Sequence, residues 1–283
     1  MNIRTVSEVV CDLGEGPIWN AEENTVIWTD ITQKIFYVAD LDMKVTIGYR
    51  VPAMIGAIAL TRDKNFIAAT QEGFAQISSS GEFSPLHSFL TADMRMNDGK
   101  VDPAGRFWAG SLAFSFEIDR GSLYVLNKDG SYRTVLNNLT LSNGMAWSLD
   151  HKYFYLIESI PGVLKRFDYD HLQGEISNPI DLITFDTSMG IPDGMCLGSN
   201  GEIFVALWDG GRIEIYEPTG VKISEILLEV SRPTSCTFAG EKRDVLIVTT
   251  SSLERDLIQE PLAGKTLAIS ETGWSGPAPY VYG

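Results

Sequence analysis

Residues 98–111 read DGKVDPAGRFWAGS and contain the unit that is repeated along the chain. In this unit an acidic residue stands before a glycine, the polar turn DPAG (102–105) follows, and the aromatic core FWAGS (107–111) comes last. A run of β-branched, aromatic and small apolar residues between Gly, Asp and Pro turns predicts a buried strand. The fold prediction therefore depends on how often this unit recurs.

Five other strand cores follow polar turns in the same way. The six cores are VIWTD (26–30), FIAAT (66–70), FWAGS (107–111), YFYLI (153–157), IFVAL (203–207) and VLIVT (245–249). Their centres lie about 40 to 50 residues apart, and a weaker strand follows each core. That period, with several strands per unit, is typical of propeller blades. The sequence predicts an all-β, six-bladed β-propeller with a central channel, formed by residues 1–283 as a single domain. A two-sheet sandwich is the alternative, but it agrees less well with six evenly spaced copies of the unit.

Composition narrows the classes of function. The 283 residues carry a formal net charge of −15, and no Lys/Arg run is present, so we expect no nucleic-acid partner. No segment approaches the roughly 18 apolar residues of a membrane span, and the first residues lack the apolar stretch of a signal peptide. The three separated cysteines, Cys11, Cys196 and Cys236, are expected to be buried thiols. These features predict a cytoplasmic protein with no membrane partner, as a monomer or weak homo-oligomer.

Four oxygen-bearing side chains stand directly before glycines, each upstream of a strand core: Glu15, Asp98, Asn143 and Asp193. Equivalent positions in four blades would bring them to one mouth of the channel. Carboxylate and amide oxygens suit Ca²⁺, Mg²⁺ or Mn²⁺, and Zn²⁺ also accepts carboxylates. Taken alone, each of these residue–glycine pairs is also common in ordinary turns, because Gly tolerates positive φ. Only the four together indicate a cation site.

Other kinds of site have little support. His87, His151 and His171 are the only histidines, expected in a loop, a turn and a hairpin, and no two have metal-ligand spacing in the sequence. This disfavours a His-rich zinc site and a Ser-His-Asp mechanism. The sequence also contains neither a GxSxG elbow nor a GxxxxGK phosphate loop.

Six motifs stand in order along nearly the whole chain: LGEGPIW (13–19), RMNDGKVDPAGRFWAGSL (95–112), LSNGMAWSLDHKYFY (141–155), IPDGMCL (191–197), WDGGRI (208–213) and GPAPYVYG (276–283). Together they resemble the SMP-30/gluconolactonase/luciferin-regenerating-enzyme-like family. The resemblance implies a six-bladed propeller, hydrolysis of sugar lactones, and one catalytic divalent cation, namely Ca²⁺, Mg²⁺, Mn²⁺ or Zn²⁺.

The resemblance also assigns roles to single residues. The family's metal-binding Glu, Asn and Asp correspond to Glu15, Asn143 and Asp193. Its substrate-contacting Arg and Asn correspond to Arg95 and Asn97. Asp193 is then the catalytic residue that orients and deprotonates the attacking water. Asp98 is expected either to support the site or only to stabilise the backbone turn that contains it.

One loop, residues 112–122, departs from the family pattern. Some relatives carry a substrate-contacting Glu where Ser115 stands here, and Glu117, two residues later, is our candidate for that contact. Phe114 and Phe116 in the same loop either line a more apolar pocket wall or pack inward. The loop therefore leaves the identity of the lactone open.

We expect a metal-dependent lactonase, a carboxylic-ester hydrolase that opens a sugar (aldono-)lactone such as gluconolactone to the aldonic acid. Three alternatives remain: a non-catalytic Ca²⁺-binding regulatory protein, an organophosphate hydrolase of the diisopropylfluorophosphatase type, and an interaction scaffold without metal dependence. The regulatory alternative has less support, because the chain contains no DxDxDG-type calcium loop.

Overall fold

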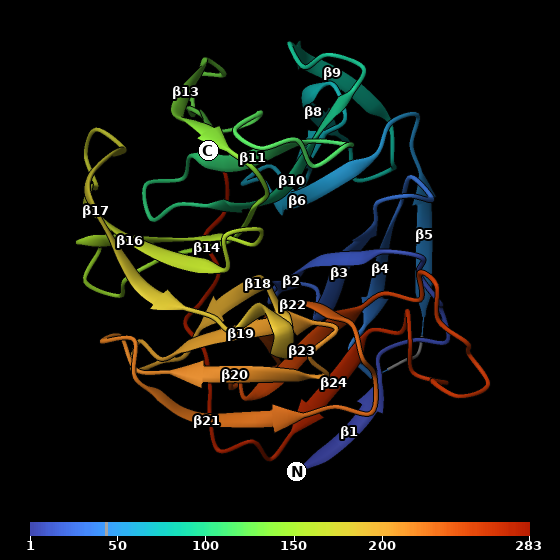
Figure 1. Ribbon diagram of the computed structural model, residues 1–283. Coiled ribbons are helices and arrows are strands. Elements are labelled where there is room, and N and C mark those ends of the chain that lie inside the picture. Colours follow the sequence, from blue (N-terminus) through green and yellow to red (C-terminus); the bar gives the residue numbers. More distant parts are fainter. Residues whose placement is uncertain (43–44) are drawn as a thin grey trace. The chain divides into compact units, whose positions relative to one another are not determined.

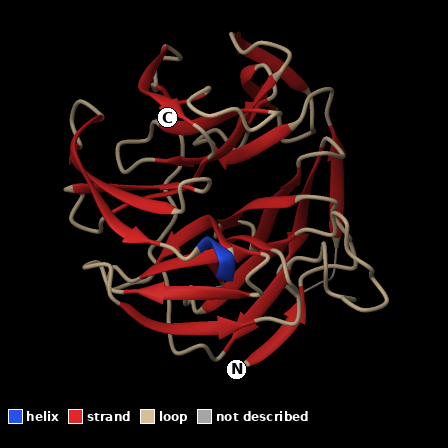
Figure 2. Cartoon of the chain, in the orientation of Figure 1, coloured by secondary structure: helices blue, strands red, loops and turns tan. Residues whose placement is uncertain are grey.

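The computed structural model describes residues 1–42 and 45–283, and its secondary structure is almost entirely β-strand (Figure 1). The strands form six four-stranded sheets. The described residues contain no α-helix and only one 3-10 turn, Thr187–Met189, the blue segment in Figure 2. Six such sheets are the blades of a six-bladed β-propeller. The predicted fold class is confirmed.

Each blade runs from a first strand to an outer fourth strand. The first strands are β2 (Gly14–Asn20), β6 (Ile55–Leu60), β10 (Met94–Val101), β14 (Ser142–Trp147), β18 (Ile191–Leu197) and β22 (Pro233–Ala239). The second are β3 (Thr25–Asp30), β7 (Phe66–Thr70), β11 (Phe107–Ala113), β15 (Tyr153–Glu158), β19 (Ile203–Trp208) and β23 (Val245–Thr250). The third are β4 (Ile35–Asp40), β8 (Gly73–Ile77), β12 (Gly121–Leu126), β16 (Val163–Asp170), β20 (Arg212–Tyr216) and β24 (Leu267–Ser270). The outer strands are β5 (Thr46–Arg50), β9 (Phe83–Ser88), β13 (Tyr132–Leu139), β17 (Glu175–Thr184), β21 (Lys222–Leu227) and β1 (Asn2–Thr5).

The six predicted cores are the second strands of the six blades. Their side chains are buried almost throughout because both faces of a second strand are covered; Phe107 and Trp108 of β11, for example, are fully buried. The last blade is completed by the N-terminal strand, since β1 pairs with β24 and Asn2 lies opposite Ser270. None of the described segments is a helix of the length and apolarity that a membrane crossing requires.

The chain divides into two compact units. One comprises residues 1–49 and 185–278, and the other comprises residues 50–184 and 279–283. In the first unit β22 contacts both β2 and β18, and in the second β10 contacts both β6 and β14. Within each unit, therefore, the first strands of three blades lie side by side. The expectation of a single domain over residues 1–283 stays a prediction.

Glycines allow these first strands to approach one another closely. A Cβ on Gly194 of β18 would lie 2.7 Å from the Cα of Ser235 on β22. A Cβ on Gly56 of β6 would lie 2.6 Å from the carbonyl oxygen of Met96 on β10. Real Cβ contacts are not this short, so a side chain at either position would have to push the neighbouring strand away.

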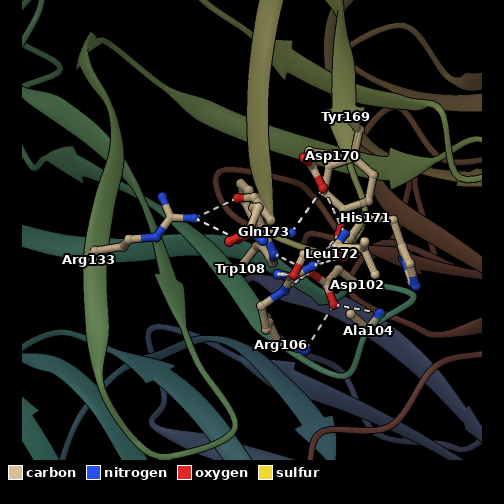
Figure 3. Close-up of polar contacts among 11 residues, drawn as sticks. Asp102, Ala104, Arg106, Trp108, Arg133, Tyr169, Asp170, His171, Leu172 and Gln173 are labelled. Atoms are coloured by element: carbon tan, nitrogen blue, oxygen red, sulfur yellow. Dashed lines mark hydrogen bonds and ion pairs between the residues drawn. The ribbon is translucent and has the colours of Figure 1, made fainter.

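A buried ion pair in one blade of the second unit is hydrogen-bonded to the neighbouring blade (Figure 3). Arg106 Nε donates to Asp102 Oδ2 at 2.6 Å, and Arg106 Nη2 donates to the Tyr169 hydroxyl at 2.9 Å and to the carbonyl oxygen of His171 at 2.7 Å. The same Asp102 oxygen accepts from Trp108 Nε1 at 2.9 Å and from the Tyr169 hydroxyl at 2.8 Å. The polar turn of the repeated unit is thereby fixed against the neighbouring blade.

The structure settles several expectations about cysteines and histidines. Cys11, Cys196 and Cys236 are buried thiols that form no disulfide, as predicted. His87 does not lie in a loop but on β9, where its Nε2 bonds the carbonyl oxygen of Gly130 at 2.7 Å. The rings of His151 and His171 stack with centroids 5.1 Å apart, a pairing that their spacing in the sequence does not reveal.

Candidate metal and substrate site

A β-bulge lies at the predicted site residues of β10. The pairing with β11 passes from Met96 opposite Ser111 to Gly99 opposite Ala109. Asn97 and Asp98 therefore share a single partner position, that of Gly110. Such a bulge redirects side chains that a regular ladder would point elsewhere.

The same bulge recurs in β14 and β18. Register shifts occur between Ser142 and Met145 and between Pro192 and Met195, so Asn143 and Asp193 are each the first bulged residue. By this register the counterpart of both is Asn97, not Asp98. Glu15 stands one position earlier, paired with Thr29 before the shift that ends at Ile18. The idea that all four residue–glycine pairs occupy equivalent positions is therefore wrong for Asp98 and Glu15.

In the first unit, Glu15 and Asp193 are buried carboxylates on strands that flank β22. Each is only 6% exposed. Glu15 Oε2 accepts from the backbone nitrogen of Gly16 at 3.1 Å. The Thr234 hydroxyl of β22 donates to the carbonyl oxygen of Gly14 at 2.5 Å, which ties β22 to the strand of Glu15. Buried carboxylates are normally hydrogen-bonded, paired with a cation or coordinated to a metal ion.

In the second unit, Asn143 offers a buried acceptor. Its side chain is 4% exposed, and its Nδ2 donates to the Ser159 hydroxyl at 3.1 Å. Its Oδ1 has no hydrogen-bond partner among residues 1–42 and 45–283. A buried carbonyl oxygen without a donor costs about 1–3 kcal/mol. Coordination to a hard cation would remove that cost, so the residue fits its predicted role as a ligand.

Arg95 and Asn97 form a buried polar chain next to Asn143. Arg95 Nη1 donates to Asn97 Oδ1 at 2.7 Å and to the carbonyl oxygen of Met96 at 2.9 Å. Asn97 Nδ2 donates in turn to the carbonyl oxygen of Ser142 at 2.9 Å. The two predicted substrate contacts are thus fixed relative to the strand that holds Asn143.

Asp98 lies beside this chain in a different environment. Burial raises the pKa of its carboxyl group, while the charge of Lys100 and the hydrogen bond from the Gly99 nitrogen to Oδ1, at 2.7 Å, act in the opposite direction. Its Oδ2 has no hydrogen-bond partner in the described ranges. A supporting role for Asp98 stays a prediction.

The loop after β11 is exposed along residues 114–120. Glu117 forms an ion pair with Arg120, with 2.7 Å between Oε2 and Nη1. Its assignment as a substrate contact, like that of Ser115, stays a prediction. Phe114 and Phe116 are exposed, so the alternative that these rings pack inward is wrong.

Two tryptophans differ in their surroundings. Trp19 is buried in a hydrophobic cluster of the first unit. Trp208, at the end of β19, is half-buried, and the guanidinium carbon of Arg232 lies 4.6 Å from its ring centroid. Arg232 Nε also donates to Asp209 Oδ1 at 2.7 Å.

The described part of the chain contains no group of three or more His, Cys, Asp or Glu side chains placed to hold an ion. The predicted donor set is of another kind, because it includes the amide of Asn143. Its two carboxylates belong to one unit and the amide to the other.

Comparison with known proteins gives one consistent result. The model of the SMP-30/gluconolactonase/LRE-like region matches residues 13–252. Regucalcin of Pongo abelii is 34% identical over 284 residues, which is 96% of this chain and 95% of the relative. A crystal structure of regucalcin from Agrobacterium tumefaciens, described as a calcium-binding protein, has a TM-score of 0.94 at 22% identity and covers 99% of this chain and 97% of its own. A luciferin-regenerating enzyme has a TM-score of 0.89 at 26% identity and covers 99% of both chains.

Proposed function

The chain belongs to the SMP-30/gluconolactonase/LRE-like family, and on that premise we propose that it is a divalent-metal-dependent hydrolase that opens the ester bond of a lactone. The proposed substrate class is the sugar (aldono-)lactones, with gluconolactone as the first to test, and the product is the aldonic acid. The observation that carries the proposal is the buried Oδ1 of Asn143, which has no donor among the described residues.

Three side chains are proposed to hold the cation. They are the carboxylates of Glu15 and Asp193 and the Oδ1 of Asn143, all buried and all on first strands. An all-oxygen donor set suits Ca²⁺, Mg²⁺ or Mn²⁺ and tolerates Zn²⁺. The Agrobacterium relative is described as a calcium-binding protein, which makes Ca²⁺ the first ion to test.

The remaining chemistry is assigned to side chains of this protein. When bound, the cation supplies Lewis-acid polarisation of the lactone carbonyl. Asp193 takes a proton from the attacking water, whose oxygen bonds to the carbonyl carbon. The ring C–O bond then breaks, and the proton passes to the ring oxygen to give a hydroxyl group. Arg95 and Asn97 hold substrate hydroxyls, and their mutual hydrogen bond keeps them in place before substrate arrives.

The test uses metal-free protein and a panel of five- and six-carbon aldonolactones. Acid release is followed with Ca²⁺, Mg²⁺, Mn²⁺ and Zn²⁺ in turn. We expect turnover only with a cation, and a loss of roughly 10²-fold or more in kcat/KM for Asp193→Asn and Glu15→Gln. Turnover by the metal-free protein, or wild-type rates in both variants, would contradict the proposal.

A regulatory calcium-binding function is the second candidate, favoured by the description of the Agrobacterium relative. Calcium binding without turnover of any lactone or of an organophosphate, assayed in parallel, would support it. For the enzyme we propose a small-molecule substrate, no nucleic-acid or membrane partner, and a monomeric or weakly associating state. The three free cysteines suit a reducing compartment, so we propose a cytoplasmic location.

A further inference from the structure

The loop between β11 and β12 exposes three large apolar side chains. Phe114 is 41% exposed, Phe116 is 51% exposed and Ile118 is 71% exposed. A concentration of exposed apolar groups on one short loop is typical of a surface that binds a ligand or a partner.

The backbone of this loop is held in a costly conformation. Phe116 has a φ of +54°, in the left-handed region that bulky residues avoid. Its nitrogen donates to the carbonyl oxygen of Ala113 at 2.9 Å, which closes a tight turn. Glycine would satisfy this turn without strain. Strain borne by an exposed aromatic residue points to a function for the ring, because packing does not account for it.

Both ends of the loop are anchored. Arg120 bonds Glu117 at 2.7 Å and Asp93 at 2.8 Å. The Phe114 nitrogen donates to the carbonyl oxygen of Asp93 at 2.9 Å. The Asp119 nitrogen donates to the Thr140 hydroxyl at 3.2 Å. The apolar side chains are thus presented by a fixed backbone, and the carboxylate of Glu117 is engaged by Arg120.

The loop leaves the blade at the end that carries the predicted substrate contacts. In the β10–β11 ladder Leu112 lies opposite Arg95 and Ala113 opposite Met94. Phe114 follows directly, so the apolar loop begins within two residues of the cross-strand neighbour of Arg95. Directly opposed residues in such a ladder have Cβ atoms about 5 Å apart. The apolar loop and the Arg95–Asn97 pair therefore belong to the same end of the same blade.

We propose that Phe114, Phe116 and Ile118 form an apolar subsite, through which the site also accepts lactones whose ring carries an alkyl or aryl substituent. This rests on the proposed lactonase function and extends its substrate class. Arg95 and Asn97 hold ring hydroxyls where the substrate carries them, and the loop covers the substituent. Burial of that apolar surface supplies affinity that a polyhydroxylated ring does not gain.

The test compares two six-membered lactones, δ-nonalactone with a butyl substituent and glucono-δ-lactone, with saturating Ca²⁺. The readout is the ratio of their kcat/KM values in the wild type, in Phe116→Gly and in Phe114→Ser/Phe116→Gly. We expect the ratio of δ-nonalactone to glucono-δ-lactone to fall roughly tenfold for each ring removed, because only the butyl lactone gains from contact with the rings. Phe116→Gly suits the positive φ, so we expect its melting temperature to be at or above that of the wild type. Leu227→Ala, an exposed apolar residue on β21, is the matched control, and its ratio should equal that of the wild type.

Other results would overturn the subsite. The subsite is refuted if the ratio of the two kcat/KM values is the same in the wild type and the double variant. It is also refuted if the wild type sediments as a dimer, only the double variant is monomeric, and the ratio stays constant. If neither lactone is hydrolysed, the proposed function fails, and binding of the non-hydrolysable 6-butylpiperidin-2-one is compared with that of gluconolactam by calorimetry. Tighter binding of the butyl lactam that Phe116→Gly abolishes would still support the subsite. Equal binding or no binding would refute it.

Discussion

The side-chain amide of Asn143 on β14 donates to the hydroxyl of Ser159, the residue directly after β15, at 3.1 Å. This bond determines that the Nδ2 atom of the amide, and not its Oδ1 atom, faces Ser159. It leaves Oδ1 buried, with no partner in residues 1–42 and 45–283. The orientation of this proposed cation ligand therefore depends on a single hydroxyl group. Groups that hydrogen-bond to metal ligands often orient them in this way.

Replacing Ser159 by Ala should weaken cation binding. Without the hydroxyl, the Asn143 amide is free to rotate and Oδ1 is no longer held in one place. We expect the calcium dissociation constant, measured by titration calorimetry, to rise roughly tenfold. Ser199→Ala, which removes an exposed hydroxyl bonded to Ser275, is the control and should bind calcium as the wild type does. Wild-type affinity in Ser159→Ala would show that this bond does not position the ligand.

Replacing Asp98 by Asn should stabilise the protein at neutral pH and have no effect in acid. Burial raises the pKa of Asp98, so its contribution to stability is complete below the unfolded value of about 3.9 and is lost as pH rises through the folded value. Asn carries no charge at any of these pH values. We expect the melting temperature of Asp98→Asn to exceed that of the wild type by a few degrees at pH 7, and the difference to vanish near pH 4.

The control for this pH dependence is Asp129→Asn. Hydrogen bonds from the side chain and the backbone of Ser131 lower the pKa of exposed Asp129, so the sign is opposite: any stability it contributes is present at neutral pH and lost in acid. Both variants are scanned at one fixed calcium concentration, because a bound ion shifts the melting temperature by mass action. An Asp98→Asn difference that is constant from pH 4 to 8 would contradict the titration.

Replacing Asp102 by Asn should destabilise the second unit. Arg106 would keep its bonds to Tyr169 and to the His171 carbonyl but lose the buried carboxylate that balances its charge (Figure 3). Removing one partner of a buried ion pair typically costs about 3–5 kcal/mol. Urea unfolding followed by tryptophan fluorescence measures the loss. Adding Arg106→Met to Asp102→Asn removes the unbalanced charge and should recover part of the loss; no recovery would contradict this account.

The blade architecture was predictable because it depends on local pattern. Cores such as FWAGS (107–111) are β-rich and follow polar turns at a regular period, and each became a second strand. The equivalence of Asn97 with Asn143 was not predictable from the glycine pairs. It depends on the register of the bulges, which is set by pairing with a neighbouring strand rather than by the dipeptide itself.

Loop and network contacts were predictable to a smaller extent. The loop aromatics Phe114 and Phe116 had two possible environments, and only the structure shows that they are exposed. The ion pair between Arg120 and Asp93, which holds one end of this loop, joins residues 27 positions apart in the sequence. The Arg106 network likewise reaches Tyr169, 63 residues further along the chain. Such contacts arise from the stacking of blades and leave no short-range signal.

Replacing Gly194 by Ala should disturb the strand that carries Asp193. The new Cβ would overlap the Oγ and Cβ of Ser235 and lie 2.7 Å from its Cα, so β18 and β22 must separate or the bulge must change. Overpacking of this kind typically costs about 1–3 kcal/mol, and it would displace the proposed catalytic carboxylate next in the chain. We expect a lower melting temperature together with weaker calcium binding, measured by calorimetry on the same sample. Combining Gly194→Ala with Ser235→Gly removes the opposing side chain and should recover part of both losses. If the second substitution recovers neither, the side chain of Ser235 is not what requires glycine at this position.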